Sequence, residues 1–375
     1  MEESKKRTFR FPFYVVKRMG LASWKYWLIR AGGILLAFLI AGITCAILKP
    51  GSFGTFYAEM FRGCFDFSDI ETLIDLLIKT CVLLLICIAL IPAFKMKFWN
   101  IGAEGQILIG CLAAAGIAKF ANPDLPNAVI LMLAMLGAMA ASVVWSVIPA
   151  IFKAYFNTNE TLFTLMLNYI ATIACGLAIS VWIKSGSQTF GVLSQGTFPD
   201  VLDNSGTLVI PITILVFTGM YFYITKSKHG YELSVVGESR NTARYLGINI
   251  KNVIIRTMIQ SGCICGLLGF MIVCGINRSF SETIVGGKGF TGVLISWLSH
   301  FDPLEAILFS FLSAVFEQGT QTAATAVNIS STQFSAICTG IFFFIIIACE
   351  FFSRYQIKMH HKEKVEEVNA NGVSS

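Results

Sequence analysis

The feature that most constrains this chain is a series of long apolar runs, each close to the length of a membrane-crossing helix. A helix needs roughly 17 to 25 mostly apolar residues to cross the hydrocarbon core of a bilayer. The sequence therefore predicts an all-α, polytopic transmembrane helical bundle of about ten spans. The predicted spans are residues 31–48, 72–94, 101–118, 127–150, 161–183, 207–225, 254–276, 289–301, 303–317 and 333–352.

The composition agrees with this prediction and excludes other classes of protein. Hydrophobic residues make up 55% of the 375 residues and charged residues only 13%, whereas a soluble domain carries about 25% charge. A soluble enzyme, a disordered tail and a nucleic-acid-binding module are therefore excluded. The 11 cysteines form no CxxC pair and have no histidine at metal-ligand spacing, so we expect them to be small buried hydrophobic residues.

The last third of the predicted bundle contains an irregular region. Segments 289–301 and 303–317 are short and are separated only by a polar turn around Asp302 and Pro303. The pattern fits two half-helices, a re-entrant pair or one broken span.

The distribution of basic residues predicts the orientation, because cytoplasmic connections carry the excess of Lys and Arg. With a cytoplasmic N-terminus, the two terminal segments and the inner connections hold 21 of the 28 Lys and Arg residues, and the outer connections hold six. The remaining one, Lys79, lies within a span. Ten crossings place both termini in the cytoplasm, whereas a nine-crossing alternative places the basic C-terminal tail outside.

These patterns divide the chain into three parts. Residues 1–30 form a basic cytoplasmic leader, in which residues 11–29 fit either an interfacial helix or an aromatic belt ahead of the first span. Residues 31–352 form the transmembrane domain, with a large cytoplasmic loop over about 226–253. Residues 353–375 form a polar cytoplasmic tail.

The densest polar stretch at membrane depth covers residues 100–106. Asn100 is a candidate N-cap, and Glu104 falls in the first helical turn, where the positive end of the helix dipole favours a carboxylate. Ionisable groups inside a membrane are costly and are frequently functional. We therefore expect Asn100, Glu104 and Gln106 to line the substrate path, and a capped helix start with a glycine packing face is the alternative.

A second polar stripe begins the next predicted span but one. Asn159 is a candidate cap, and Glu160, Thr164 and Asn168 recur every four residues and so share one helix face. A polar stripe in an apolar span faces the bundle interior or an aqueous cavity. We expect these four residues to line the path as well, with interhelical hydrogen bonding as the alternative.

The inner loop over about 226–253 has the pattern of a short structured helix. Ser239 or Asn241 can cap such a helix, and Gly247 suits the position just after its end. A short helix lying on the cytoplasmic surface is expected to dock a partner, and a solvated loop is the alternative.

The sequence holds no catalytic or nucleotide-binding motif. Gly286-Gly-Lys-Gly289 lacks the Ser or Thr that follows the lysine of a phosphate loop. We expect no catalytic residue, no metal and no cofactor bound by this chain, so any ATP is used by a partner subunit. The competing hypothesis is a secondary transporter, although Asp75 and Glu317 lie near span ends rather than at the midplane where coupling carboxylates are expected.

In order along the chain, these stretches resemble the permease subunits of bacterial ABC importers for nucleosides and simple sugars, in the branched-chain amino-acid and ribose-type permease superfamily. The residues that carry the resemblance are Asn100-Ile-Gly-Ala-Glu-Gly-Gln106, Asn159-Glu160, Met166-Leu-Asn-Tyr169, Gly230-Tyr231, Val236-Gly-Glu238, Ala243-Arg-Tyr245, Gly247-Ile248 and Gly289-Phe-Thr-Gly292.

The resemblance implies a membrane-spanning importer subunit in the bacterial cytoplasmic membrane, with ATP hydrolysed by a separate ATP-binding cassette protein. It implies that ATPase, a second permease (a copy or a sister chain), an extracytoplasmic solute-binding lipoprotein and the lipid bilayer as partners, and no nucleic acid. It also implies that the inner loop couples the permease to the ATPase. The residues that would do so are Gly230, Tyr231, Gly237, Glu238, Arg240, Ala243, Arg244, Tyr245 and Gly247.

A nucleoside is the favoured substrate. A polar, largely uncharged path among many phenylalanines suits a ribosyl group and a base that stacks on aromatic faces. A pentose or another simple sugar is the alternative.

Overall fold

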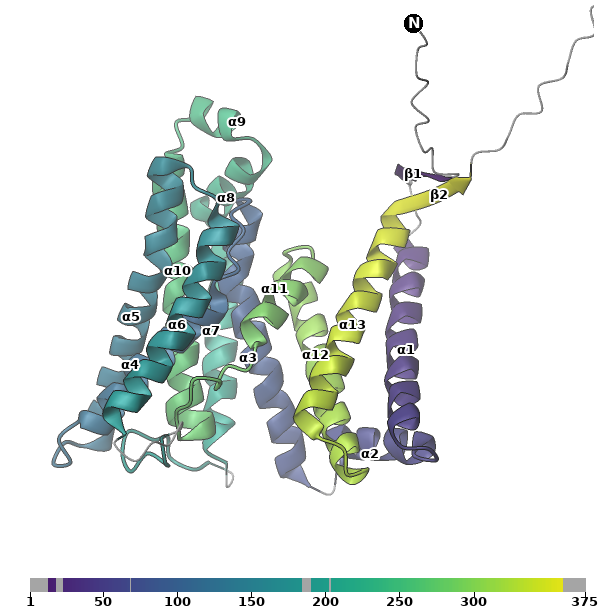
Figure 1. The fold of residues 1–375 in the computed structure, drawn as a ribbon. Coiled ribbons are helices and arrows are strands. Elements are labelled where there is room, and N and C mark those ends of the chain that lie inside the picture. Colours follow the sequence, from purple (N-terminus) through teal and green to yellow (C-terminus); the bar gives the residue numbers. More distant parts are fainter. Residues whose placement is uncertain (1–12, 18–22, 68, 184–189, 202–203, 360–375) are drawn as a thin grey trace, which may run out of the picture. The chain divides into compact units, whose positions relative to one another are not determined.

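The computed structural model describes residues 13–17, 23–67, 69–183, 190–201 and 204–359 (Figure 1). They form two compact units, one made of residues up to 53 together with residues from 337 onward, and the other of residues 54–336. The elements in chain order are β1 (Phe13–Lys17), α1 (Ser23–Leu48), α2 (Phe53–Phe65), α3 (Ile70–Lys95), α4 (Ala103–Phe120), α5 (Asn127–Phe156), α6 (Glu160–Trp182), η1 (Ser205–Leu208), α7 (Val209–Lys226), α8 (Lys228–Glu238), α9 (Arg240–Tyr245), α10 (Ile250–Met271), η2 (Ile272–Asn277), α11 (Lys288–Leu298), α12 (Pro303–Ala326), α13 (Ser331–Arg354) and β2 (Tyr355–Met359).

The structure confirms a helical membrane bundle. Each of the ten predicted segments is helical, and within the described residues eight helices are long and apolar enough to cross a bilayer. These eight are α1, α3, α4, α5, α6, α7, α10 with its continuation η2, and α13. The helix α2 falls in a stretch predicted to be an outer connection, and its 13 residues are too few to span.

The irregular region resolves into two separate helices. With 11 residues, α11 is about 16 Å long, roughly half the thickness of a bilayer core. The following helix, α12, has 24 residues, so the predicted end near residue 317 was wrong. The helix continues through its polar second half because that half has partners: Gln318 donates to the Gly63 carbonyl oxygen at 2.9 Å, and the hydroxyls of Thr320 and Ser335 are 2.9 Å apart.

Of the residues 11–29 predicted as an interfacial helix or an aromatic belt, the structure describes 13–17 and 23–29, and neither part forms a separate interfacial helix. Residues 13–17 are a strand, β1, which pairs antiparallel with β2 so that Phe13 lies opposite Met359 and Lys17 opposite Tyr355. The aromatic and β-branched composition of β1 favours a strand. The first span begins earlier than predicted, at Ser23, and exposes Trp24 and Trp27, as the aromatic-belt alternative expects.

A buried ion pair joins α1 and α13 within the unit that holds both termini. The Arg30 guanidinium lies 3.2 Å from the Glu350 carboxylate, and both residues are buried. Charges inside a membrane are tolerated when they pair in this way.

The larger unit is packed around α3 and α10. The second half of α3 is buried on all sides. A glycine of α10 allows a close helix contact: a Cβ at Gly266 would lie 2.5 Å from the Ala138 carbonyl oxygen of α5. The cysteines are free, and nine of the 11 are buried, as predicted.

Candidate functional site

The polar stretch at residues 100–106 forms a buried hydrogen-bonded turn ahead of α4. The predicted N-cap Asn100 is not the cap, because the N-cap of α4 is Gly102, two residues later. The Asn100 side chain instead accepts from the Gly102 amide at 2.9 Å and from Gln106 at 3.4 Å. Ser261 of α10 closes the network with contacts of 3.4 Å to both side chains.

The polar stripe of α6 binds this same turn. Thr164 accepts from the Ile101 amide at 3.2 Å. Asn168 accepts from the Gly105 amide and donates to the Ile101 carbonyl oxygen, both at 2.9 Å. The two polar stretches predicted separately therefore form one cluster, and α6 fixes the backbone that starts α4.

The carboxylate of Glu104 joins α4 to the start of α11. Its two oxygens accept from the amides of Gly287 and Gly289 at 2.8 and 2.7 Å. A Cβ at Gly289 would lie 2.5 Å from the Glu104 backbone nitrogen, so only glycine permits this approach. The positive ends of two helices thus share one buried carboxylate.

The remaining predicted path residues lie at the start of α6. Asn159 is confirmed as its N-cap and accepts from the amides of Thr161 and Leu162. Glu160 is buried and pairs with Lys153 of α5 at 2.6 Å. Apart from the exposed Asn159, every predicted path residue is buried and bonded within the protein; a role in lining the path stays a prediction.

A further polar group at membrane depth centres on Lys79. This residue lies nine positions into α3, about 14 Å from its start. Its ammonium group donates to the Gln321 side chain at 3.3 Å, and Glu317, Lys288 and Asp75 lie within electrostatic range. Lys79 was placed inside a span by the sequence, but its hydrogen-bond partner Gln321 lies 242 positions away and was not foreseen.

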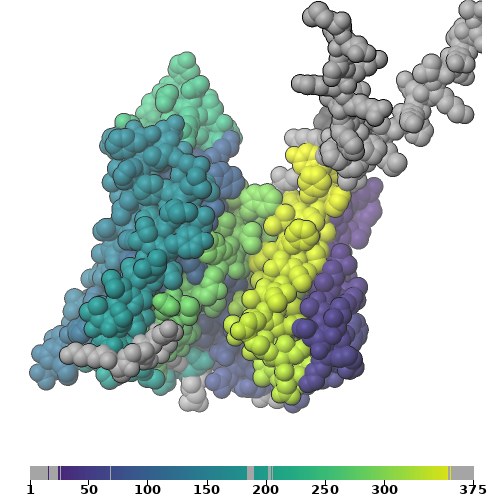
Figure 2. Space-filling view, viewed as in Figure 1, coloured from purple at the N-terminus to yellow at the C-terminus, as the bar shows by residue number. Residues whose placement is uncertain are grey.

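The inner loop folds into two short helices, α8 and α9, at one end of the larger unit (Figure 1). A small apolar core holds them: Leu233, Val236 and Ala243 pack with Phe98, Met258 and other residues from the ends of α3, α5 and α10. The segment forms a projection in the space-filling view (Figure 2). At its tip Tyr245 is 92% exposed and Leu246 57% exposed.

The caps predicted for the short helix are confirmed. Ser239 accepts from the Thr242 amide and caps α9. Gly247 has φ +74°, and the amides of Gly247 and Ile248 bond the carbonyl oxygens of Arg244 and Ala243. This Schellman arrangement ends α9 abruptly, so its tip is held in one conformation.

An ion pair fixes α8 to α10. Glu232 lies 2.8 Å from Arg256 and 3.5 Å from His229. The hydrogen bond from Arg256 holds the pKa of Glu232 below its ordinary value, and His229 adds to this effect. A lowered pKa means that the contact stabilises the fold at neutral pH and is lost only as the pH falls through that lowered pKa.

Gly237 lets α8 lie directly on the turn after α3, because an added Cβ would overlap the carbonyl oxygen of Lys95. We expect Gly237→Ala to push α8 away, lower the thermal unfolding midpoint and cost on the order of 1–3 kcal/mol. The matched control is Gly219→Ala in α7, which has no atom within 4 Å of the added Cβ. Equal unfolding midpoints for the two variants would refute this packing argument.

Comparison with known proteins places these features in a family context. Residues 72–348 match the family model described as branched-chain amino acid transport system / permease component. The chain is 25% identical over 344 residues to the glucose ABC transporter permease protein TsgB13 of Haloferax volcanii, covering 86% of this chain and 88% of that protein. It is 28% identical over 282 residues to the guanosine ABC transporter permease protein NupP of Bacillus subtilis, covering 73% and 80%. For the nucleoside ABC transporter permease protein NupB of Lactococcus lactis subsp. cremoris, the identity is 27% over 281 residues, covering 71% and 76%.

Proposed function

Because this chain belongs to the branched-chain amino acid transport system / permease component family, we propose that it imports a nucleoside, driven by a separate ATP-binding cassette ATPase. The chain is a multi-pass membrane permease subunit of an ABC transporter. The substrate, the direction of transport and the partners belong to the proposal.

The observation that carries the proposal is the projection formed by α8 and α9. Its two helices are capped, it is fixed to the ends of several spanning helices, and it ends in an exposed tyrosine and leucine. A rigid apolar tip of this kind suits docking to another subunit. The projection contacts α3 at Gly237 and α10 through Glu232. A movement of the projection is therefore transmitted to both helices, and ATP-driven closure of the ATPase switches the bundle between two states.

The choice of a nucleoside rests on two relatives and on the chemistry of the polar residues. NupP and NupB carry guanosine and nucleoside in their names, whereas TsgB13 carries glucose, which supports a simple sugar such as a pentose as the second candidate. Lys79 and Gln321 offer hydrogen bonds at membrane depth, and they suit the hydroxyl groups that both substrates share.

The proposed assembly also holds a second permease, a copy or a sister chain, and an extracytoplasmic solute-binding lipoprotein. We also propose that both termini and the α8–α9 segment lie on the cytoplasmic side of the cell membrane, because the basic residues predict this orientation.

Purification of the tagged full chain in mild detergent, followed by mass spectrometry, tests the assembly. We expect a Walker-motif ATPase and a second permease to be recovered. Uptake of labelled guanosine by cells that express the complex then tests the substrate, with unlabelled ribose and glucose as competitors. Recovery of the chain alone in several detergents would contradict the proposal, and absence of guanosine uptake together with uptake of labelled ribose or glucose would favour the second candidate.

Lys79 and Gln321 supply a separate prediction about the path. We expect a cysteine at Gln321, which is partly exposed, to react with a membrane-impermeant thiol reagent, because a charged neighbour keeps this region hydrated. The matched control is Ser310→Cys on the same helix, which is fully buried. Labelling is compared with the parent protein; equal labelling of the two variants would exclude an aqueous path at Gln321.

A further inference from the structure

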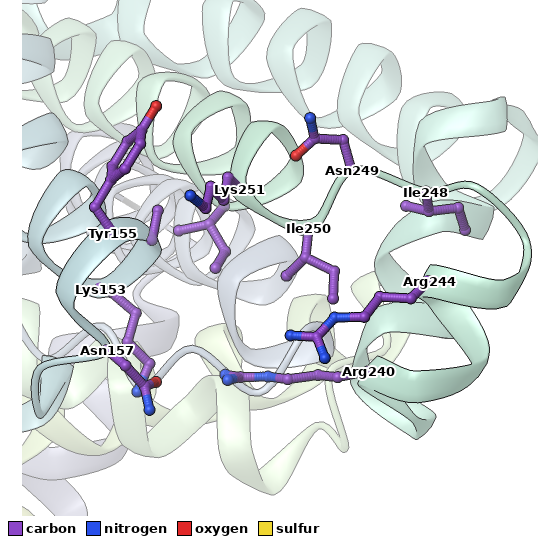
Figure 3. A pocket seen from close by; sticks show the side chains of 11 residues that line it. Lys153, Tyr155, Asn157, Arg240, Arg244, Ile248, Asn249, Ile250 and Lys251 are labelled. Carbon is purple, nitrogen blue, oxygen red and sulfur yellow. The ribbon is translucent and has the colours of Figure 1, made fainter.

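A basic cavity lies between α9 and the facing ends of α5 and α10. Its volume is about 600 Å³, and its wall includes Lys153 and Tyr155 of α5, Arg240 and Arg244 of α9, and Lys251 of α10 (Figure 3). The figure shows the side chains of Arg240 and Arg244 directed from α9 toward the end of α5. The cavity thus gathers cations from three separate elements.

The charge in this cavity is largely uncompensated. Its wall has four basic residues and no acidic one. Lys153 pairs with Glu160, and Lys251 lies 4.3 Å from the centre of the Tyr155 ring. Among the residues that the structure describes, Arg240 and Arg244 form no ion pair. An anion is therefore the ligand that this cavity suits.

The surroundings of the cavity indicate where that anion comes from. The last two turns of α5 expose large apolar side chains beside the cavity: Phe152, Tyr155 and Phe156 are 41%, 60% and 70% exposed. Exposed aromatic residues at the end of a spanning helix lie at the membrane interface. Tyr155 belongs both to this aromatic surface and to the cavity wall, so the cavity opens at the height of lipid headgroups.

We propose that this cavity binds the phosphate headgroup of an anionic phospholipid from the leaflet on the α8–α9 side. The cations bind the phosphate while the acyl chains lie against the exposed aromatic end of α5. Basic pockets between membrane helices hold anionic headgroups in this way. Only the identification of this leaflet as cytoplasmic rests on the proposed function.

Such a lipid would contact the projection itself. Arg240 and Arg244 belong to α9, whereas Lys153 belongs to a spanning helix. A bound phosphate would hold the outer face of α9 to the end of α5, complementing the apolar core on its inner face. Tyr245 and Leu246 do not line the cavity and stay available to another subunit.

The test is native mass spectrometry of the delipidated full chain, titrated with dioleoyl-phosphatidylglycerol and with dioleoyl-phosphatidylcholine. We expect the anionic lipid to bind more tightly, and Lys251→Gln and Arg240→Gln each to weaken its binding about fivefold, the equivalent of about 1 kcal/mol per removed cation. The matched control is Lys228→Gln, an exposed lysine of α8 outside the cavity, which should change nothing.

Three results would overturn the proposal. The first is equal binding of the two lipids, and the second is anionic-lipid binding that neither cavity variant weakens. The third is displacement of the lipid by millimolar inorganic phosphate, which would make free phosphate the ligand. Since the measurement needs neither the ATPase nor transport, its failure is distinguishable from failure of the proposed function. If the two cavity variants bind the anionic lipid normally but no longer co-purify the ATPase, the cavity is instead a contact surface for the ATPase.

Discussion

Replacing Tyr245 and Leu246 together by alanine is expected to lower solute uptake at least tenfold while the protein still inserts and folds. Both side chains are exposed at the tip of α9, so removing them costs the isolated permease little. Tyrosines are enriched among the interface hot spots, each of which contributes about 2 kcal/mol or more, equivalent to about a 30-fold change in affinity. Uptake in cells and co-purification of the ATPase measure the two effects.

The matched control for this pair is Asn241→Ala, an exposed polar residue on the same short helix. It should leave uptake and co-purification unchanged. The thermal unfolding midpoint of the purified permease should be the same for all three proteins. If the double variant transports normally, the projection does not couple the permease to an ATPase, and the proposed function loses its main support.

The second large effect is expected at Glu104. In Glu104→Ala the amides of Gly287 and Gly289 lose their acceptor inside the bundle. Hydrogen bonds to a charged group contribute about 1.5–3 kcal/mol each, so the free energy of unfolding should fall by on the order of 3 kcal/mol or more. We expect loss of uptake together with a lower unfolding midpoint. Glu104→Gln keeps one acceptor oxygen, so its unfolding midpoint should lie between those of Glu104→Ala and the parent protein.

Glu71→Gln is the control for Glu104. Glu71 is also a first-turn carboxylate of a spanning helix, but it is exposed. Its replacement should change the unfolding midpoint very little. If Glu104→Ala unfolds at the parent's temperature yet loses uptake, the carboxylate acts in transport and not in joining α4 to α11, which would support its predicted role in the substrate path.

Local patterns predicted the individual helices well. Hydrophobic length gave the spans, and the caps Asn159 and Ser239 and the terminator Gly247 were recognisable because a cap depends on only a few neighbouring residues. Predictions were wrong where contacts with distant residues, and not the local composition, decided the conformation of a segment. The strand β1 needs β2, more than 300 residues away, and the polar end of α12 needs acceptors on α2 and in the first turn of α3.

The sequence by itself determined that this chain is a membrane bundle, which polar stretches it contains, and where its short surface helix begins and ends, because hydrophobic length and capping are properties of neighbouring residues. Only the tertiary structure decided what the polar groups contact. Asn168 and Glu104 were visible as costly residues, but the backbone amides that donate hydrogen bonds to them lie 63 to 185 positions away. The same holds for the basic cavity: the sequence places Lys153 and Arg240 in separate inner connections, and only the packing of α9 against the ends of α5 and α10 gathers them into one site.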